Sequence, residues 1–286
     1  MNGRITRRIA AAAVGVVVAA GAVAAGPQAS GAATPSLRAY AISADGTLMA
    51  TFTTDKPGVF NWFRAIQGLV GDTSAIGLDY RVQDGLMYLV GNKGGIYSVK
   101  TPPAVDDVLV TKVSQLTIPL YGANFGVDFN PAADRLRVIS DNGQNLRHNL
   151  HDHTTTEDAV LTLPPDQGTA RGVTAAAYTN NDLNPDTATT LFDISPALDQ
   201  VLVQSPANNG TLAATGKLTV DAGANAGFDI HSVLSGGKAV SLLGFATLTT
   251  STGTGLYSVN LLNGEVSLVG NFPLAFTDLA LTLTGS

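Results

Sequence analysis

The stretch F-G-V-D-F-N-P-A-A-D-R-L-R-V-I-S-D-N-G-Q-N-L-R, residues 125–147, decides the fold. Apolar and polar residues alternate along it, which is the pattern of strands with one buried face. Asn130-Pro131 and Asp141-Asn142-Gly143 interrupt the alternation with residues typical of tight turns. The stretch therefore predicts strands at 126–130, 135–140 and 144–150, and we expect a fourth strand at 159–163.

Weaker copies of this stretch recur along the chain. They begin with G-L-D-Y at 77, G-V-D-F at 126, G-V-T-A at 172, G-F-D-I at 227 and, in degenerate form, F-T-D-L at 276. The third positions of the copies lie 49, 46, 55 and 49 residues apart. A period near 50 residues is typical of the four-stranded blade of a β-propeller.

The two ends of the chain complete each other in this interpretation. Residues 38–43, 47–53 and 59–66 have the pattern of the second, third and fourth strands of a blade that lacks its first strand. Residues 277–283 have the pattern of a first strand without successors. We therefore predict an all-β, five-bladed β-propeller, closed by pairing the C-terminal strand with the N-terminal blade, which removes exposed sheet edges.

Residues 1–33 have the layout of an export signal. Arg4, Arg7 and Arg8 precede an uncharged, Ala-rich run, and small residues follow it. A membrane anchor is the alternative, but the run is weakly hydrophobic, and it is too short for a span of about 20 residues. We expect cleavage, through the general rather than the twin-arginine route, to leave residues 34–286 as one secreted, extracellular domain without a membrane span.

Charge and composition exclude several classes of protein. Without the three leader arginines the chain has 13 basic and 22 acidic residues, a formal charge of -9, which repels nucleic acid. Cysteine is absent, so thiol chemistry and disulfides are excluded. The motifs G-x-S-x-G and H-E-x-x-H and the Walker loop are also missing. We expect a monomer that binds no nucleic acid.

Four aspartates occupy the repeated third position, with Thr174 in the remaining copy: Asp79, Asp128, Asp229 and Asp278. The innermost strands of a propeller line its central channel, so these carboxylates could converge and hold a calcium-like cation or another ligand. The alternative, which we favour, is that each carboxylate accepts hydrogen bonds from backbone N–H groups.

Three further clusters have the residue types of binding sites. Asp182, Asn184 and Asp186 form a D-x-N-x-D loop, whose alternate oxygens suit calcium, although we favour a solvated polar loop as the explanation of the pattern. Arg135 and Arg137, with Arg147, could recognise an anionic ligand bidentately. The alternative, which we favour, is that they pair with Asp128, Asp134 or Asp141. His148, His151 and His153 have metal-ligand spacing, but a hairpin turn between them would separate the rings.

The chain resembles the bacterial family called domain of unknown function 4394. The resemblance is carried by G-V-D-F-N-P-A-A-D-R-L-R-V-I-S-D-N-G-Q-N-L-R at 126–147, by G-V-T-A-A-A-Y-T-N at 172–180 and by A-N-N-G-T-L-A-A-T-G-K-L-T-V-D-A-G-A-N-A-G-F-D-I at 207–230. It covers nearly everything after the leader. It implies an exported, propeller-like domain and no particular activity, and the histidine cluster falls outside its pattern.

The sequence favours a non-catalytic binding or interaction module for an unknown extracellular ligand or envelope component. Propellers suit this role because their loops surround a channel mouth while the sheets stay rigid. One alternative is a metal-dependent hydrolase or lyase that acts on a sugar or lactone through the aspartates of the channel. Another is a cell-envelope scaffold.

Overall fold

The computed structural model describes residues 33–285, so the predicted export signal lies almost wholly outside the described residues. Regular structure in this part of the chain is β-strand, apart from the three-residue 3-10 turn η1 (Ala207–Asn209). No helix among the described residues is long and apolar enough to cross a membrane. The prediction of an all-β chain is confirmed.

Three of the sheets have four antiparallel strands each. The first contains β8 (Phe125–Asn130), β9 (Arg135–Ser140), β10 (Asn145–Asn149) and β11 (Thr154–Glu157). The second contains β12 (Ala175–Tyr178), β13 (Leu191–Ser195), β14 (Gln200–Gln204) and β15 (Leu212–Lys217). The third contains β16 (Ala226–Ser235), β17 (Lys238–Thr250), β18 (Gly253–Val259) and β19 (Val266–Asn271). In each sheet, strands that follow one another in sequence are neighbours.

The remaining strands form one eight-stranded sheet in the order β20-β1-β2-β3-β7-β6-β5-β4. Its strands are β1 (Arg38–Ser43), β2 (Leu48–Thr53), β3 (Trp62–Gln67), β4 (Ala75–Arg81), β5 (Leu86–Gly91), β6 (Gly95–Lys100), β7 (Val108–Gln115) and β20 (Phe276–Leu281). Two antiparallel halves meet at a short parallel ladder, in which Ile66 pairs with Val108 and Gln67 with Leu109. The predicted pairing of the C-terminal strand with the N-terminal strands is present, because β20 pairs with β1 from Ala39–Leu281 to Ser43–Phe276.

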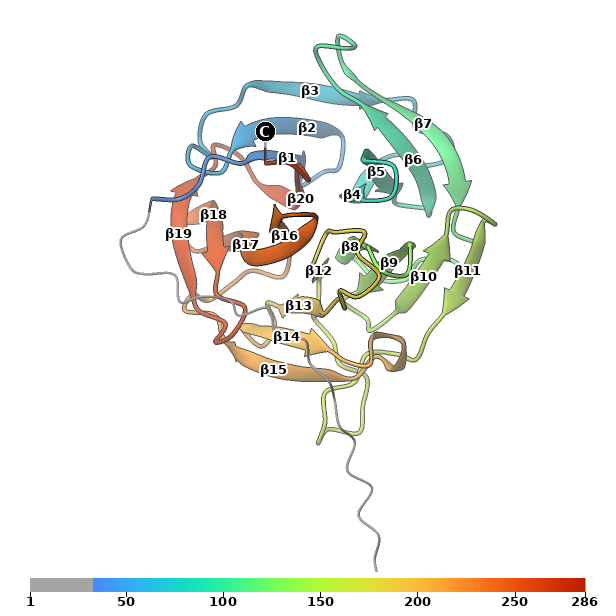
Figure 1. Ribbon diagram of the computed structural model, residues 1–286, viewed down its shortest axis with the longest axis vertical. Helices are drawn as coiled ribbons and strands as arrows, with labels where there is room; N and C mark the ends of the chain where they lie inside the picture. The colour runs from blue at the N-terminus through green and yellow to red at the C-terminus, as the bar shows by residue number, and fades with distance from the viewer. Residues whose placement is uncertain (1–32, 286) are drawn as a thin grey trace, which may run out of the picture.

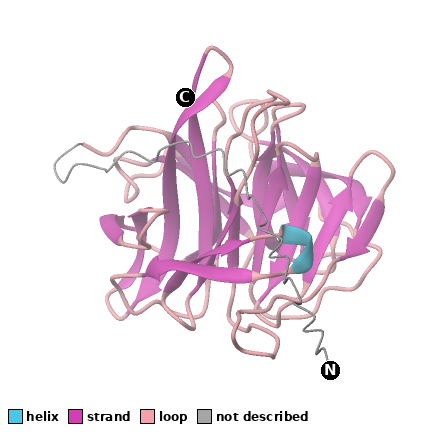
Figure 2. Cartoon of the chain, turned by 60° about the horizontal axis from the view of Figure 1, so that its bottom comes forward, coloured by secondary structure: helices cyan, strands magenta, loops and turns pink. Residues whose placement is uncertain are grey.

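The sheets stand around a common centre in a propeller-like ring (Figure 1). Strands β4, β8, β12, β16 and β20 lie nearest the centre, and β3, β7, β11, β15 and β19 lie at the rim (Figure 1). Loops gather at the two ends of the strands (Figure 2). The innermost strands therefore all present side chains to one central space, as the sequence repeat predicts.

Apolar side chains fill the spaces between neighbouring sheets. On β8, for example, Phe125, Val127 and Phe129 alternate with polar or small residues and pack against Tyr88 of β5 and its neighbours. A comparable cluster joins β12–β15 to β16–β19, with Phe228 of β16 buried in it. Because side chains alternate along a strand, the residues between these apolar positions face the next sheet around the ring.

The repeated glycine allows the innermost strands to approach closely. A Cβ atom on Gly126 would lie 2.7 Å from the backbone carbon of Ala175, and one on Gly227 would lie 2.4 Å from the Cα of Asp278. Both separations are shorter than side-chain carbons tolerate, and backbone atoms cannot move aside cheaply. The glycine of the G-x-D motif is thus explained by strand packing at the centre of the ring.

Two strand predictions are wrong. The fourth strand of the β8 sheet is Thr154–Glu157 rather than 159–163, because the chain turns tightly at Asp152 and His153, which has a φ of 59°. Residues 159–163 instead run along the neighbouring sheet, where Thr162 bridges to Thr211. The innermost strand of the β12 sheet starts at Ala175, three residues after the G-V-T-A motif begins.

Candidate channel site

The four repeated aspartates all lie on innermost strands and are buried. Asp79 is on β4, Asp128 on β8, Asp229 on β16 and Asp278 on β20, and each is between 2% and 6% exposed. On each strand the carboxyl group alternates with apolar residues that pack toward the preceding sheet. The strand period therefore turns every carboxylate toward the next innermost strand around the ring.

Each carboxylate accepts a hydrogen bond from a neighbouring innermost strand around the ring. Asp278 accepts from the Leu78 N–H at 3.0 Å and Asp79 from the Phe129 N–H at 2.7 Å. The bond from the Tyr178 N–H to Asp128 is 3.1 Å, and that from the Leu281 N–H to Asp229 is 2.5 Å. These bonds link neighbouring innermost strands around the ring, as the scaffold interpretation that we favoured on sequence grounds expects.

The fourth sheet has no carboxylate at the equivalent position. Tyr178 donates to Asp128 as Phe129 donates to Asp79, so Ala177, one residue earlier, is the counterpart of Asp128. Ala177 also faces the following sheet, because it belongs to the apolar cluster that joins β12–β15 to β16–β19. The prediction that Thr174 occupies the repeated position is therefore wrong by three residues, and the corrected position lies 49 residues after Asp128.

Three of the carboxylates also converge on one point. One oxygen each from Asp79, Asp128 and Asp229 lies within 4.8 Å of the others. Both Asp229 oxygens accept backbone N–H groups, from Ile230 and Leu281, but a carboxylate oxygen has two lone pairs and can accept such a bond while it also faces its neighbours. Oxygen ligands in such a group suit a hard cation, for which these three residues, beside Asp278, are the candidate ligands.

Burial and mutual repulsion raise the pKa values of this cluster. Burial is the first cause for each group, and it raises the pKa of Asp229 to about 6. The pKa values of Asp79 and Asp128 are raised well above the usual range by burial and then by the neighbouring aspartates. Burial likewise raises the pKa of Asp278. Below those pKa values protons neutralise the cluster, and above them a cation can do so.

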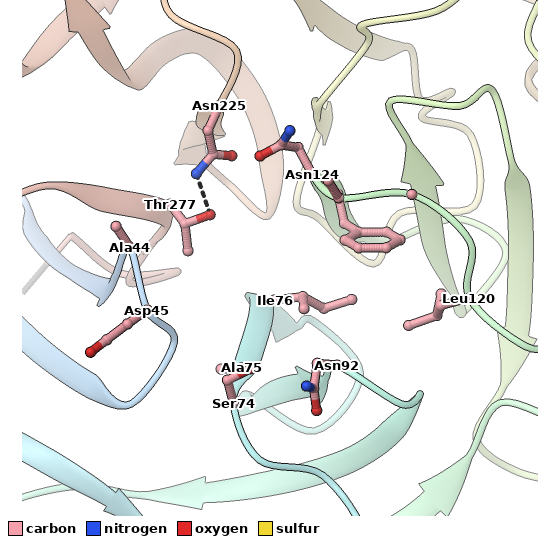
Figure 3. A pocket seen from close by; sticks show the side chains of 13 residues that line it. Ala44, Asp45, Ser74, Ala75, Ile76, Asn92, Leu120, Asn124, Asn225 and Thr277 are labelled. Carbon is pink, nitrogen blue, oxygen red and sulfur yellow. Dashed lines mark hydrogen bonds between the residues drawn. The ribbon is translucent and has the colours of Figure 1, made fainter.

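A polar pocket of about 350 Å³ opens at the end of the ring where the innermost strands begin (Figure 3). Its polar lining includes Asp45, Asn92, Asn124, Asn225 and Thr277. Asn225 donates to the Thr277 hydroxyl, and its own Oδ1 is buried without a partner among the described residues. The carboxylates lie one to four residues further along the same strands, which is within roughly 15 Å at about 3.3 Å per residue.

The asparagines of this pocket were not predicted from the sequence, although they lie in a repeated pattern. Asn124 and Asn225 each stand two residues before the motif glycine, in the repeated sequence G-A-N-x-G-x-D. Figure 3 shows both side chains at the pocket. A longer comparison of the two copies would have placed these residues with the aspartates.

The arginines of the opening stretch do not line this pocket. Arg137 is buried, and its Nη1 contacts Asp158 Oδ2 at 2.7 Å, while Arg147 Nε contacts the same oxygen at 2.9 Å. Arg135 donates to the carbonyl oxygens of Ala133 and Asp134. Arg137 and Arg147 therefore pair with an aspartate, as the alternative interpretation expected, but with Asp158. Anion recognition by Arg135 and Arg137 stays a prediction.

The D-x-N-x-D loop uses its oxygens on backbone groups. Asp182 accepts from the N–H groups of Ala239 and Asn184, both at 2.9–3.0 Å, and Asn184 accepts from the Asp186 N–H at 2.9 Å. These contacts are those of a polar loop stabilised by Asx turns. Within residues 33–285, His, Asp and Glu side chains converge in threes only at the channel aspartates. Calcium binding at Asp182, Asn184 and Asp186 stays a prediction.

Two of the clustered histidines meet at a serine from the preceding sheet. His148 Nε2 and His153 Nδ1 each lie 2.8 Å from the Ser114 hydroxyl, and His148 Nδ1 lies 2.9 Å from the Thr155 hydroxyl. Burial and then His153 lower the pKa of His148 to about 4. Sequence spacing could not reveal Ser114, because the contact joins β7 of one sheet to β10 and the β10–β11 turn of another.

Comparison with known proteins identifies a family and several similar folds. The sequence model described as "Domain of unknown function (DUF4394)" matches residues 48–280. No curated protein matches the sequence.

Among solved structures, Myxococcus xanthus glutaminyl cyclase is similar at 10% identity, with a TM-score of 0.44, over 79% of this chain and 100% of that one. A Bacteroides thetaiotaomicron protein of unknown function is similar at 14% identity, with a TM-score of 0.47, over 89% of this chain and 68% of that one. The WD40 domain of Toxoplasma gondii coronin is similar at 12% identity, with a TM-score of 0.41, over 83% of this chain and 58% of that one.

Proposed function

The chain belongs to the DUF4394 family, a domain of unknown function, and we propose that it is an exported, five-bladed β-propeller that binds a small cationic ligand at its channel mouth. Five blades follow if the two halves of the eight-stranded sheet count separately. The support is that these halves share only the two residue pairs of the β3–β7 ladder, while each half is a complete antiparallel set of four strands. Export and extracellular location are part of the proposal through the pattern of residues 1–33.

One observation supports the binding site above all others. Carboxylate oxygens from three different sheets lie within 4.8 Å of one another, close to the polar pocket beside which the innermost strands of those sheets begin. Buried like charges at this separation repel strongly unless a proton or a cation lies between them. A calcium-like cation is the simplest ligand of this chemistry, with Asp79, Asp128 and Asp229 as its ligands and Asp278 beside them.

A binding role accounts for this geometry better than catalysis. The carboxylates are at most 6% exposed and already accept backbone N–H groups, so a sugar or lactone cannot reach them without movement of the innermost strands. The alternative of a metal-dependent hydrolase or lyase draws its support from the pKa of Asp229, near 6, which suits an acid or base.

A cation titration tests the proposal. The mature chain is first treated with a chelator, and its melting temperature is then followed as CaCl2, MgCl2 or MnCl2 is added. Binding to the folded chain alone raises the free energy of unfolding by RT ln(1 + [L]/Kd), about 2.7 kcal/mol at a hundredfold excess over Kd. We expect a rise with one of these salts that Asp128→Asn abolishes and the exposed control Asp221→Asn retains. No rise with any cation would refute the cation site.

A second experiment separates the binding module from the envelope scaffold. A pull-down from the producing cell's envelope, repeated with and without chelator, asks whether any partner is held through the channel mouth. A partner that is retained equally by wild type and Asp128→Asn would favour the scaffold role.

A further inference from the structure

A second cleft lies between the β8–β11 and β12–β15 sheets, away from the carboxylate cluster. It has a volume of about 290 Å³ and is lined by side chains that include Asn130, Tyr178, Thr190, Gln204 and Asn208. Every lining side chain is uncharged at neutral pH. The cleft thus offers amide and hydroxyl groups beside the apolar surfaces of an aromatic ring and a leucine, a mixture that suits a neutral polar ligand.

A buried network fixes the amides of the cleft in one orientation. Arg137 Nη2 donates to Asn208 Oδ1 at 2.8 Å, and Arg137 Nη1 donates to Asn145 Oδ1 at 2.7 Å. Asp158 neutralises the guanidinium through its contact at 2.7 Å. Because arginine only donates, the amide oxygens of Asn208 and Asn145 must face it. The Nδ2 group of Asn208 is therefore directed away from Arg137 as a donor.

Gln204 presents the complementary acceptor. It is 2% exposed, and its Nε2 donates to Asn145 Oδ1 and to the Ala207 carbonyl oxygen. Its Oε1 is buried with no hydrogen-bond partner in the described part of the chain. An acceptor left in this state costs about 1–3 kcal/mol, which a ligand hydroxyl would recover.

Asn130 adds a second donor. Its Oδ1 accepts from the N–H groups of Ala132 and Ala133, both at 2.9 Å, so its Nδ2 is the donor end. This Nδ2 bonds to the Tyr178 hydroxyl, and because an amide nitrogen carries two hydrogens it keeps one for a ligand. The Tyr178 hydroxyl, which accepts from Arg137 Nε at 3.3 Å, can itself donate. Donors and an acceptor therefore surround a space the size of one small ring.

We propose that this cleft binds a single sugar unit or a similar neutral polyol. Adjacent hydroxyl groups donate and accept at once, so they can meet the oriented amides of Asn208 and Asn130 and the carbonyl of Gln204 together. The uncharged lining discriminates against ionic ligands, and the volume excludes long chains. The cleft has its own lining side chains, which include none of the channel aspartates, although the backbone N–H of Tyr178 donates to Asp128.

The near-isosteric change Asn208→Asp tests the proposal. It keeps the oxygen that accepts from Arg137 and replaces the donor Nδ2 with a second acceptor. Asn209→Asp is the matched control, because Asn209 is its exposed neighbour outside the lining and the charge change is identical. The probes are glucose, galactose, mannose, N-acetylglucosamine and myo-inositol, followed by saturation-transfer NMR on the mature chain.

We expect at least one probe to bind wild type and Asn209→Asp alike, and to bind Asn208→Asp at least tenfold more weakly, which corresponds to about 1.4 kcal/mol. Thr190→Trp, which fills the cleft from an exposed position, should abolish the same signal. The proposal is overturned if no probe binds wild type, or if a bound probe is unaffected by both Asn208→Asp and Thr190→Trp. Calcium and chelator should leave this binding unchanged, which separates it from the channel test.

Discussion

Replacing Asp128 with Asn should stabilise the cation-free protein at alkaline pH. The Asn side chain has nearly the same shape, and its Oδ1 can still accept the Tyr178 N–H that Asp128 accepts at 3.1 Å. The new amide group can donate to a neighbouring carboxylate instead of repelling it. The substitution therefore removes charge repulsion and retains the bond between sheets.

The magnitude follows from the separation of the charges. Two unit charges 4.8 Å apart repel by about 3.5 kcal/mol at an effective dielectric constant of about 20. Asp128 has two such neighbours, Asp79 and Asp229. Protons retained by the neighbours relieve part of this repulsion, so we expect a net gain of about 2–3 kcal/mol. In a chain of this length that gain raises the Tm by roughly 5–10 °C.

The gain should depend on pH in a defined direction. The folded-state pKa of Asp128 is raised above the unfolded value, so its contribution to stability is fully present below about pH 4. That contribution is lost as the pH rises through the folded pKa. Wild type and Asp128→Asn should consequently have similar stability at pH 4 and diverge as the pH increases.

Thermal unfolding followed by circular dichroism, in the presence of a chelator at pH 4 and pH 8, measures the gain in stability and its dependence on pH. Asp221→Asn serves as the control, because it removes an exposed carboxylate that is not one of the four channel aspartates. An Asp128→Asn protein that melts at or below the wild-type temperature at pH 8 would show that the carboxylates do not repel one another as the geometry requires.

Three further predictions concern the contacts between sheets. Gly126→Ala should destabilise the fold by about 1–3 kcal/mol in urea unfolding, since its Cβ would lie 2.7 Å from the backbone of the next strand; an unchanged urea midpoint contradicts this. Arg137→Met should lower the free energy of unfolding by about 3 kcal/mol in urea unfolding, because Asp158 then keeps only Arg147 as a partner. The control Arg135→Met, at a more exposed position, should change that free energy by less than about 0.5 kcal/mol. The pKa of His148 is lowered in the folded state, so its contribution to stability is present above about pH 6.5 and is lost as the pH falls toward 4. Over that range the free energy of unfolding of wild type should fall by about 2–3 kcal/mol more than that of His148→Gln. Urea midpoints of the two proteins that change in parallel with pH would refute this prediction.

The sequence allowed much of the ring to be predicted, because the strand pattern and turn residues are local signals. The alternation around Asp128 correctly placed β8 and β9, and the incomplete units at the two ends predicted the β1–β20 pairing. The register of β12 failed for a physical reason. Its innermost strand, A-A-A-Y, is almost featureless, and three alanines carry no alternation that a sequence pattern can detect.

The candidate site could be predicted only in part. The repeat placed four aspartates on innermost strands, but whether their oxygens face one another or a backbone N–H depends on distances between sheets. The structure shows that both occur, and a single-strand pattern carries no information about either. The contact of His148 with Ser114 and the pairing of Arg137 with Asp158 likewise depend on how separate strands are placed in three dimensions.

The pairing of β20 with β1 makes closure of the ring depend on a strand that is synthesised long after its partner. Until residues 276–281 are available, β1 has an unpaired edge at the centre of the molecule, and Asp229 lacks the Leu281 N–H. A growing or prematurely ended chain thus exposes strand edges that can pair with other chains, and its contacts of longest sequence separation form last. Chaperone protection of incomplete chains, and rapid degradation of chains truncated near residue 275, follow from this order of assembly.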